Sequence, residues 1–536
     1  MSSPNSPKPK QNQSVIKSAV AMAAGTFSSR ILGFARDAVM NALFPRQVTD
    51  AFVVAFRLPN MFRRLLGEGS LSVSFIPLYI EARKDSRKNA EDMANAVFTV
   101  VFALAVTISV ACFVFMDPIV RFLVDNPDGF ASVPGKVEQT IYLARIMIFY
   151  LVLVTTYAFH MAVANTLGHF FWPSVGPTLF NVGLIIFTII PDVFGQYPGA
   201  TQSLGVIVGG VLQMGVVLWL LVKESHLPKL TLKIRSPRVG QVFRNMMPGL
   251  FGLGVFQVMT IVNTKFAAGL PEGAQTYIYL ADRILELPQS LIAVSLGTAL
   301  LPRFSEFEAQ GDRKSFLHEA NLAVRSLLYL SLPAAVGMYI LSVPLTEVLF
   351  MRGAFTAADA RGTAAVVEIY SLLMLFSSLS RVTAPAFYAL KNTWLPAVVA
   401  CGVLVLHIII GPIMVRQYGL QGLAGATTFS SILNIVVLQI FFFFMIGPLG
   451  YGRIIISVLR TLPGLLVLAM ICREGYPKLL ELAPDTWSGH VNRTLSLAVV
   501  VSVGMIAYFA ITLLTGSEAS RKVLDILKRR VFKKRA

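Results

Sequence analysis

The chain has 536 residues, of which 55% are hydrophobic and only 14% are charged, and its mean hydropathy is +0.68. Soluble domains carry about 25% charged residues, so this composition excludes a soluble enzyme, a disordered chain and a disulfide scaffold, and it indicates a polytopic membrane protein. The 46 basic and 28 acidic residues leave a net charge of +18. Most basic residues lie between apolar runs, which favours a topological role over nucleic-acid binding.

Membrane-spanning helices need about 20 mostly apolar residues each. A polar tail rich in Pro and Ser (1–14) comes first and is predicted to be disordered. Fourteen apolar segments follow, at 15–44, 48–82, 90–116, 136–166, 173–192, 201–223, 240–268, 274–302, 322–350, 357–389, 394–415, 421–446, 452–472 and 492–515. The sequence therefore predicts an all-α fold with fourteen transmembrane helices.

The distribution of basic residues predicts the orientation in the membrane. One set of connections contains dense basic clusters, including 83–88, 223–238 and the C-terminal tail, whereas the alternate connections carry scattered basic residues that nearby acids roughly cancel. Because cytoplasmic loops carry the excess of Lys and Arg, both termini are expected in the cytoplasm.

Weak internal similarity indicates a duplication. Residues 70–81 (SLSVSFIPLYIE) resemble residues 295–306 (SLGTALLPRFSE), and Trp172 and Trp394 match at nearly the same spacing. Parallel repeats of six helices imply a cleft that opens to either side, as in alternating-access transporters. The predicted domains are an N-lobe (15–223), a basic cytoplasmic linker (224–239), a C-lobe (240–446), helices 13 and 14 (447–515) and a basic cytoplasmic tail (516–536).

Several ionisable residues fall inside predicted spans, where an Arg costs about 2.5–3.5 kcal/mol on insertion scales. They are Arg30, Arg36 and Asp37 in helix 1, Arg57, Arg63, Arg64 and Glu68 in helix 2, and Asp282, Arg283 and Glu286 in helix 8. Internal ion pairs are one explanation, above all Arg57 or Arg64 with Glu68, and Arg283 with Glu286. As a set, however, the arginines of helices 1 and 2 outnumber the acids, and their planar forks match phosphate oxygens. The sequence therefore favours an anionic ligand.

Lone polar residues and cysteines give weaker signals. His160 and His407 are expected to be hydrogen-bonded core residues, and Asn181 to take part in helix packing. Cys112, Cys401 and Cys472 lie far apart, and no HExxH, GxSxG or Walker pattern occurs. The sequence thus predicts no metal centre, no disulfide framework and no bound cofactor.

Three motifs carry a family resemblance: SSRILGFARDAV, TDAFVVAFRLPNMFRRLLGEGSLSVSFIP and YLADRILELPQSLIAVSLGTALLP. They resemble the MurJ (MviN) family of bacterial lipid II flippases, and the similarity runs through all fourteen predicted helices. The resemblance implies the MOP exporter fold, with two six-helix lobes in a V and two C-terminal helices that form a groove for the lipid tail. It implies transport of lipid II, an undecaprenyl-pyrophosphate disaccharide-pentapeptide, to the outer leaflet of the bacterial cytoplasmic (inner) membrane. Membrane lipids and cell-wall synthesis proteins are the further partners it suggests.

The family's cavity residues carry over by motif. The substrate-binding residues are then Arg30, Arg36, Asp37, Arg63 and Arg283, and the supporting cavity residues are Ser29, Asp50, Asn60, Glu68 and Glu286. The sequence departs from the family's sodium site, because helix 7 has Asn263 and helix 11 has no carboxylate. This departure puts sodium coupling in doubt. The sequence does not give the energy source, although an inside-negative membrane potential can assist export of an anionic substrate.

Three alternatives remain open on the sequence alone. A flippase for another polyprenyl-pyrophosphate glycan would share the excess of arginine. A MOP-type small-molecule exporter for cationic drugs would instead present unpaired carboxylates in its cleft. A membrane glycosyltransferase would need a catalytic acid or base and an acidic pair for a metal, for which the outer segment 117–139 offers only Asp117, Asp125 and Asp128.

Overall fold

A computed structural model of the protein describes residues 9–67, 70–193, 195–482, 489–521 and 524–525. The chain is 86% helical and contains no strand within these ranges. Ten helices of the described part are long and apolar enough to cross a membrane. The predicted all-α membrane protein is confirmed at this level.

The chain divides into two compact units, of which the first contains Met1–Thr276 and Arg352–Phe355. Its elements are α1 (Pro9–Leu43), α2 (Arg46–Gly67), α3 (Ser70–Asp85), α4 (Arg87–Val114), α5 (Met116–Val124), the short η1 (Phe130–Ser132), α6 (Lys136–Met147), α7 (Tyr150–Thr166), α8 (Phe171–Ile189), α9 (Ala200–Lys223) and α10 (Pro237–Ala267).

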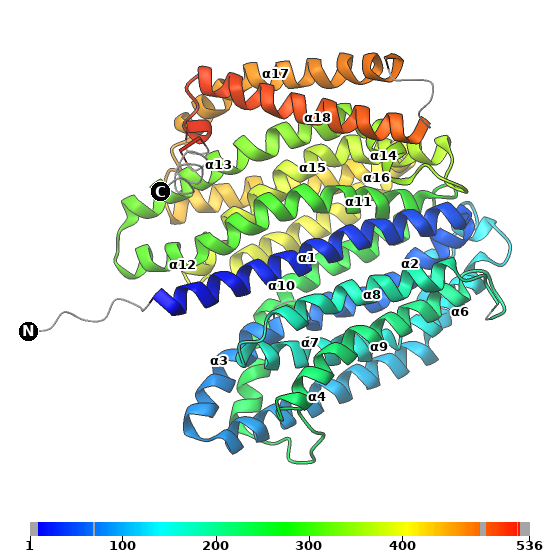
Figure 1. The fold of residues 1–536 in the computed structure, drawn as a ribbon, viewed down its shortest axis with the longest axis vertical. Coiled ribbons are helices and arrows are strands. Elements are labelled where there is room, and N and C mark those ends of the chain that lie inside the picture. The colour runs from blue at the N-terminus through cyan, green and yellow to red at the C-terminus, as the bar shows by residue number, and fades with distance from the viewer. Residues whose placement is uncertain (1–8, 68–69, 194, 483–488, 522–523, 526–536) are drawn as a thin grey trace, which may run out of the picture. The chain divides into compact units, whose positions relative to one another are not determined.

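The second unit contains Tyr277–Met351 and Thr356–Ala536. Its elements are α11 (Ala274–Gln289, whose first residues belong to the first unit), the single π-helical turn η2 (Ser290–Val294), α12 (Ser295–Ala309), α13 (Arg313–Ile340), α14 (Ser342–Phe350), α15 (Ala357–Ala389), α16 (Trp394–Met445), α17 (Tyr451–Glu481) and α18 (Gly489–Leu514). Within this unit, α17 and α18 form a packed antiparallel pair, coloured orange to red (Figure 1).

Some predicted spans are interrupted in the structure, and two others are joined at a kink. The predicted helix 274–302 is interrupted by the π-helical turn that follows Pro288, since proline removes a backbone donor and disturbs the helix. The predicted helix 136–166 breaks between α6 and α7. The spans 394–415 and 421–446 are the two arms of α16, which meet at a kink where Gly419 has a φ of 56°.

The ends of the chain differ in part from the predicted tails. α1 begins at Pro9, so residues 9–14 of the predicted tail 1–14 are helical, and residues 1–8 lie outside the described residues. Residues 526–536 of the basic tail also lie outside them.

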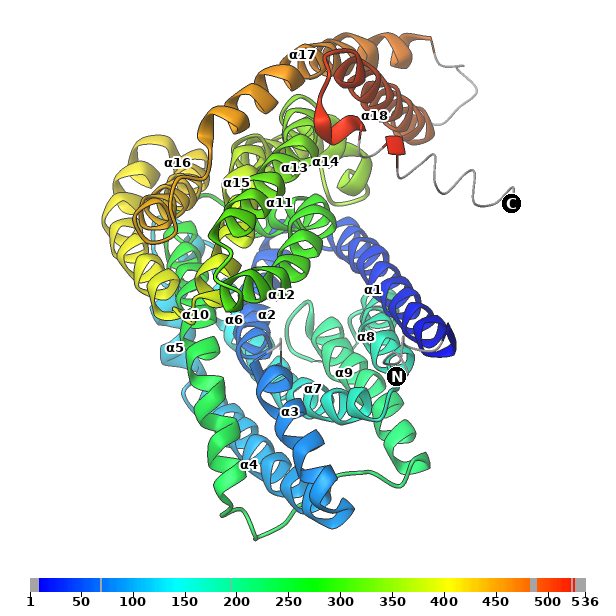
Figure 2. The ribbon, with the colours of Figure 1, turned by 90° about the vertical axis from the view of Figure 1, so that its left-hand side faces the viewer.

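The position of α10 differs from the sequence-based division. The predicted boundary at 224–239 follows the internal repeat and assigns α10 to the C-lobe. Packing groups α10 with α3 and α4 in the first unit instead (Figure 2). Val239, Val242 and Met246 of α10 are buried in one apolar core together with residues of α3, α4, α7 and α9. The lobes of the repeat therefore stay a prediction, and the compact units follow a different boundary.

The two segments of similar sequence have similar local structure. α3 begins at Ser70 and α12 begins at Ser295, the first residues of the two similar segments, and each follows a helix that carries arginines. Pro77 and Pro302 occupy corresponding positions inside these helices. The two similar segments thus adopt the same helical form.

Small residues allow α8 and α9 to pack closely. The Cα of Gly209 lies 2.9 Å from the position that a Cβ on Gly183 would take. A Cβ on Gly209 would lie 2.7 Å from the carbonyl oxygen of Phe180. Glycines on the two facing surfaces of α8 and α9 therefore form a helix-packing contact.

Gly209→Ala should lower thermal stability, because the added methyl meets backbone that cannot move aside. Overpacking of this kind costs about 1–3 kcal/mol. Gly215→Ala is the matched control on the same helix, since a Cβ there meets nothing within 4 Å, and alanine stabilises a helix by about 0.5–1 kcal/mol relative to glycine. The measurement is the melting temperature of the purified protein in detergent. Equal melting temperatures for the two variants would contradict this account of the packing.

Candidate functional site

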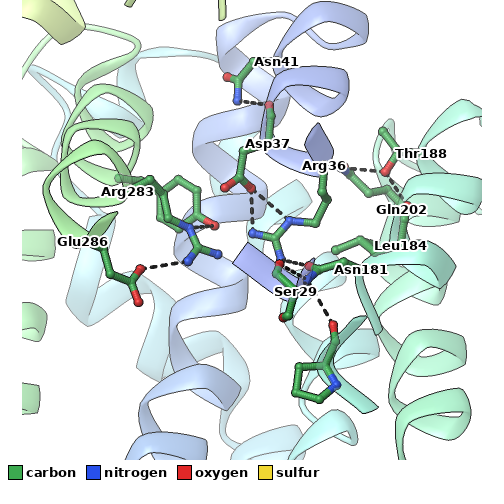
Figure 3. Close-up of polar contacts among 12 residues, drawn as sticks. Ser29, Arg36, Asp37, Asn41, Asn181, Leu184, Thr188, Gln202, Arg283 and Glu286 are labelled. Atoms are coloured by element: carbon green, nitrogen blue, oxygen red, sulfur yellow. Dashed lines mark hydrogen bonds and ion pairs between the residues drawn. The ribbon is translucent and has the colours of Figure 1, made fainter. Parts of the chain in front are cut away.

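Arg36 and Asp37 form a buried ion pair on α1. Arg36 is 4% exposed and Asp37 is 1% exposed. The Nε and Nη2 atoms of Arg36 donate to Oδ1 of Asp37 at 3.0 and 2.7 Å (Figure 3). A buried charge needs a compensating partner, and here Arg36 has one in the adjacent residue.

The same arginine connects α1 to α8. Its Nη1 donates to Oδ1 of Asn181 at 3.1 Å, and Nδ2 of Asn181 donates at 3.0 Å to the backbone carbonyl of Ser29 (Figure 3). Asn181 also donates to the carbonyl of Pro177 on its own helix at 3.0 Å. The packing role predicted for Asn181 is confirmed, and the network fixes the direction of the Arg36 guanidinium. Ser29 enters this network through its carbonyl and also through its hydroxyl oxygen, to which Nδ2 of Asn181 donates at 3.4 Å.

Asp50, near the start of α2, accepts four hydrogen bonds. The donors are Nζ of Lys136 at 3.0 Å, the backbone nitrogens of Gly273 and Thr276 at 2.8 and 2.9 Å, and the Thr276 hydroxyl at 2.7 Å. Both charged side chains are at most 2% exposed. The Lys136 ammonium also lies 4.5 Å from the centre of the Phe130 ring. Asp50 therefore joins α2, α6 and the turn before α11 within the first unit.

Further along α2, the arginines are less deeply buried. Arg57 donates to the Thr264 hydroxyl of α10, and Nε of Arg63 donates at 2.8 Å to Oδ1 of Asn60, one turn earlier. Arg63 and Asn60 are half-buried, as is Arg30 on α1. Glu68 lies outside the described residues, and its pairing with Arg57 or Arg64 stays a prediction.

In the second unit, Arg283 and Glu286 form the ion pair that their i, i+3 spacing predicts. Nη1 of Arg283 lies 3.1 Å from Oε2 of Glu286 (Figure 3). Nε of Arg283 lies 3.3 Å from the Tyr279 hydroxyl, and its guanidinium carbon lies 5.5 Å from the Tyr279 ring centre. The side chains of Arg283 and Glu286 keep 28% and 43% of their surface exposed. An exposed fraction of this size leaves Arg283 reachable by a ligand.

Both core histidines are hydrogen-bonded, as predicted. Nδ1 of His160 lies 2.7 Å from the carbonyl of Thr156, and Nδ1 of His407 lies 2.9 Å from the Ser430 hydroxyl. No group of three or more His, Cys, Asp or Glu residues suited to a metal ion occurs in the described part of the chain.

Arg121 of α5 forms ion pairs with acidic residues of α5 and α6. Its Nε lies 3.1 Å from Asp117, and its Nη2 lies 3.2 Å from Glu138. The hydrogen bond to Asp117, and then the one to Glu138, raise the pKa of Arg121 above its ordinary value. This segment therefore contains a surface ion-pair cluster around Arg121.

Sequence reasoning missed Lys136. From sequence alone, Lys136 is one of the scattered loop cations, because it stands at the start of a predicted helix with acidic residues nearby. Its partner Asp50 is far away along the chain, and no local pattern connects the two. The only sequence signal is a lone acid, Asp50, directly before an apolar run.

Comparison with known proteins gives the family. The family sequence model described as lipid II flippase MurJ matches residues 39–476. A probable lipid II flippase MurJ of Bdellovibrio bacteriovorus is 39% identical over 95% of this chain and 96% of its own length. The chain belongs to the MurJ family of lipid II flippases.

Other MurJ relatives and solved structures agree. A probable lipid II flippase MurJ of Vibrio cholerae is 30% identical over 94% of this chain and 96% of its own length. A lipid II flippase MurJ in an inward closed conformation has a similar fold, with a TM-score of 0.73 at 24% identity over 92% of this chain and 99% of that one. An inward-facing MATE family transporter of the MOP superfamily follows with a TM-score of 0.68 at 13% identity, over 80% and 98% of the two chains. The MurJ fold is thus shared with MOP transporters.

Lys136→Met should destabilise the protein strongly, because Asp50 would be left charged, buried and without its ammonium partner. Removing one partner of a buried pair costs about 3–5 kcal/mol. Asp50→Asn together with Lys136→Met should cost less than the sum of the single variants, since the uncompensated charge is then gone.

Thermal stability in detergent measures this effect. The control is Arg473→Ala, which breaks an exposed pair whose atoms lie 3.8 Å apart and should change stability by less than about 1 kcal/mol. Additive losses in the double variant would show that Asp50 and Lys136 do not interact.

Proposed function

We propose that this chain moves lipid II from the inner to the outer leaflet of the bacterial cytoplasmic membrane by alternating access. Membership of the MurJ family over most of the chain carries this proposal. It also makes the protein a membrane transporter and not an enzyme. A role in peptidoglycan synthesis follows from the substrate.

The pyrophosphate is the part of the substrate that the arginines suit. Arg30 and Arg63 in the first unit are half-buried, and Arg283 in the second unit is partly exposed. A guanidinium at this depth is desolvated enough to bind an anion more strongly than in water, and its fork can take two phosphate oxygens. These three are the proposed ligands of the pyrophosphate.

Arg36 and Asp37 differ from these residues. The pair is buried and holds α1 against Asn181. We assign Arg36 and Asp37 to the binding site as positioning residues. They set the rotation of α1 about its axis and so the placement of Arg30. Ser29, Asp50, Asn60 and Glu286 support the site by fixing backbone or arginine side chains.

The membrane arrangement completes the proposal. Fourteen spans, two parallel six-helix lobes and two C-terminal helices, with both termini in the cytoplasm, fit the distribution of basic residues and the family's fold. The partly exposed arginines Arg30, Arg63 and Arg283, on α1, α2 and α11, then contribute to the transport path. The C-terminal helices α17 and α18 contact the lipid tail.

Single replacement of Arg30, Arg63 or Arg283 by Ala should lower lipid II binding by about ten-fold to a hundred-fold, the effect of losing a charge-assisted hydrogen bond of about 1.5–3 kcal/mol. Replacement by Lys should restore part of the binding, since the charge remains and the fork is lost. The measurements are lipid II binding to purified protein and survival of cells that depend on each variant. Arg416→Ala is the control, because this exposed arginine lies on α16, outside the helices assigned to the pyrophosphate and to the lipid tail. Normal export by all three Ala variants at normal membrane levels would refute the anion-binding role.

Collapse of the membrane potential should slow export. A pyrophosphate diester carries about two negative charges, and each charge moved through 100 mV is worth about 2.3 kcal/mol, so an inside-negative potential contributes up to about 4–5 kcal/mol. The measurement is lipid II exposed at the outer leaflet before and after an ionophore removes the potential. Replacement of external sodium by potassium at constant potential is the control, and it should have no effect, because helix α10 carries Asn263 where a carboxylate would be needed. Unchanged export without a potential would exclude this energy source.

A further inference from the structure

The connection between α9 and α10 has an unusual pattern of side chains. Apolar residues at 230, 232 and 234 alternate with polar or basic residues at 231, 233 and 235. Leu232 is fully exposed at 100%, and Leu230 is 60% exposed. Large apolar side chains that stand out from a loop and alternate with cations are typical of a segment that contacts a membrane surface.

Hydrogen bonds hold this connection against α4. The backbone nitrogen of Lys229 donates at 2.7 Å to Oδ1 of Asn95, and that of Thr231 donates at 3.0 Å to the Thr99 hydroxyl. Asn95 and Thr99 lie one helical turn apart, and the Thr99 hydroxyl also donates to the carbonyl of Asn95. Further contacts fix both ends of the connection: Arg87 to the carbonyl of Ser225, and Arg238 to Asp85. The exposure of the leucines is therefore a property of an anchored segment.

The level of this anchor along α4 points to the membrane interface. The first turns of α4 contain four charged residues, of which Asp92 is the last, and no charged residue follows up to Val114. At 1.5 Å per residue, Asn95 and Thr99 lie about 5 and 10 Å beyond Asp92. The connection thus runs beside the point where α4 becomes apolar. Backbone that lipid shields from water needs hydrogen-bond partners within the protein. Asn95 and Thr99 supply such partners to the connection.

An apolar groove adjoins the segment. Its volume is about 520 Å³, and Val100 of α4, Ile234 of the connection, and Val239 and Phe243 of α10 contribute to its lining. Arg235 lies at the same groove. The space is apolar with a cation at its edge, an arrangement that suits an acyl chain beneath a phosphate. The connection and the helices α3, α4 and α10 around it all belong to the first unit (Figure 2).

The connection also carries exposed basic residues. Lys229, Lys233 and Arg235 are exposed and make no ion pair within the described ranges. Two of the nearby acids are already engaged, since Glu224 lies 3.2 Å from His169 and Asp85 pairs with Arg238. Three exposed cations thus lie on the connection that runs beside the point where α4 becomes apolar.

We propose that residues 229–235 and the adjoining groove form a binding site for an anionic phospholipid. Lys229, Lys233 and Arg235 bind the headgroup phosphate, Leu230 and Leu232 enter the acyl layer, and one acyl chain occupies the groove. The site uses residues other than the arginines assigned to the transported pyrophosphate, and it is expected to hold the connection and the start of α10 at the membrane surface.

The test uses the purified full-length protein in detergent and compares binding of phosphatidylglycerol with that of zwitterionic phosphatidylcholine by native mass spectrometry. The variant K229Q/K233Q/R235Q should lose about five-fold in phosphatidylglycerol affinity for each cation removed, or about a hundred-fold in all, the factor that corresponds to about 1 kcal/mol per basic residue. The matched control R416Q/R473Q/K478Q removes three exposed cations of the second unit and should bind phosphatidylglycerol as the unchanged protein does.

Two further arms separate a lipid site from a site for soluble phosphate. L230S/L232S keeps the cations and should also weaken phosphatidylglycerol binding. Inorganic pyrophosphate should compete poorly, since it has no acyl chain. The proposal is wrong if the triple variant binds phosphatidylglycerol normally, if the control loses as much binding, or if pyrophosphate displaces the lipid at similar concentration. Elution volume and melting temperature of each variant establish that it is folded.

Discussion

The cost of placing charge inside an apolar span is the constraint on which this structure depends. An ionised side chain in a medium of low dielectric constant must be paired, hydrogen-bonded or brought to a wet surface. Asp50 shows how fully the protein meets this demand, with an ammonium, two backbone amides and a hydroxyl around one carboxylate. Such a cluster ties three segments of the first unit together, because each of them supplies a group that the others cannot replace.

The same constraint sorts the arginines into two groups. Arg36 is buried and saturated by Asp37 and Asn181, so its contribution is to hold α1 in place. Arg283 has a carboxylate and a phenol beside it but keeps more than a quarter of its side chain exposed. Partial exposure costs less in desolvation and keeps the guanidinium within reach of an incoming phosphate. The depth of burial thus separates the positioning arginine, Arg36, from the arginines proposed as ligands.

Away from the proposed transport path, the basic excess has a second use. The connection after α9 combines cations with exposed leucines at the level where α4 turns apolar. A loop that only oriented the protein would need the cations alone. The added leucines and the adjoining groove are what point to lipid as the ligand of this segment.

Residue pattern alone determined the all-α membrane fold, the bounds of some helices such as α9 and α15, and the Arg283–Glu286 pair, because each depends on neighbours close in sequence. The motifs also determined the family and singled out Arg30, Arg36, Arg63 and Arg283. Only the tertiary structure decided that Lys136 is the partner of Asp50, that Asn181 orients Arg36, and that α10 packs with α3 and α4. Those pairings join residues far apart along the chain, and periodicity and spacing carry no information about which distant helix will supply a buried charge with its partner.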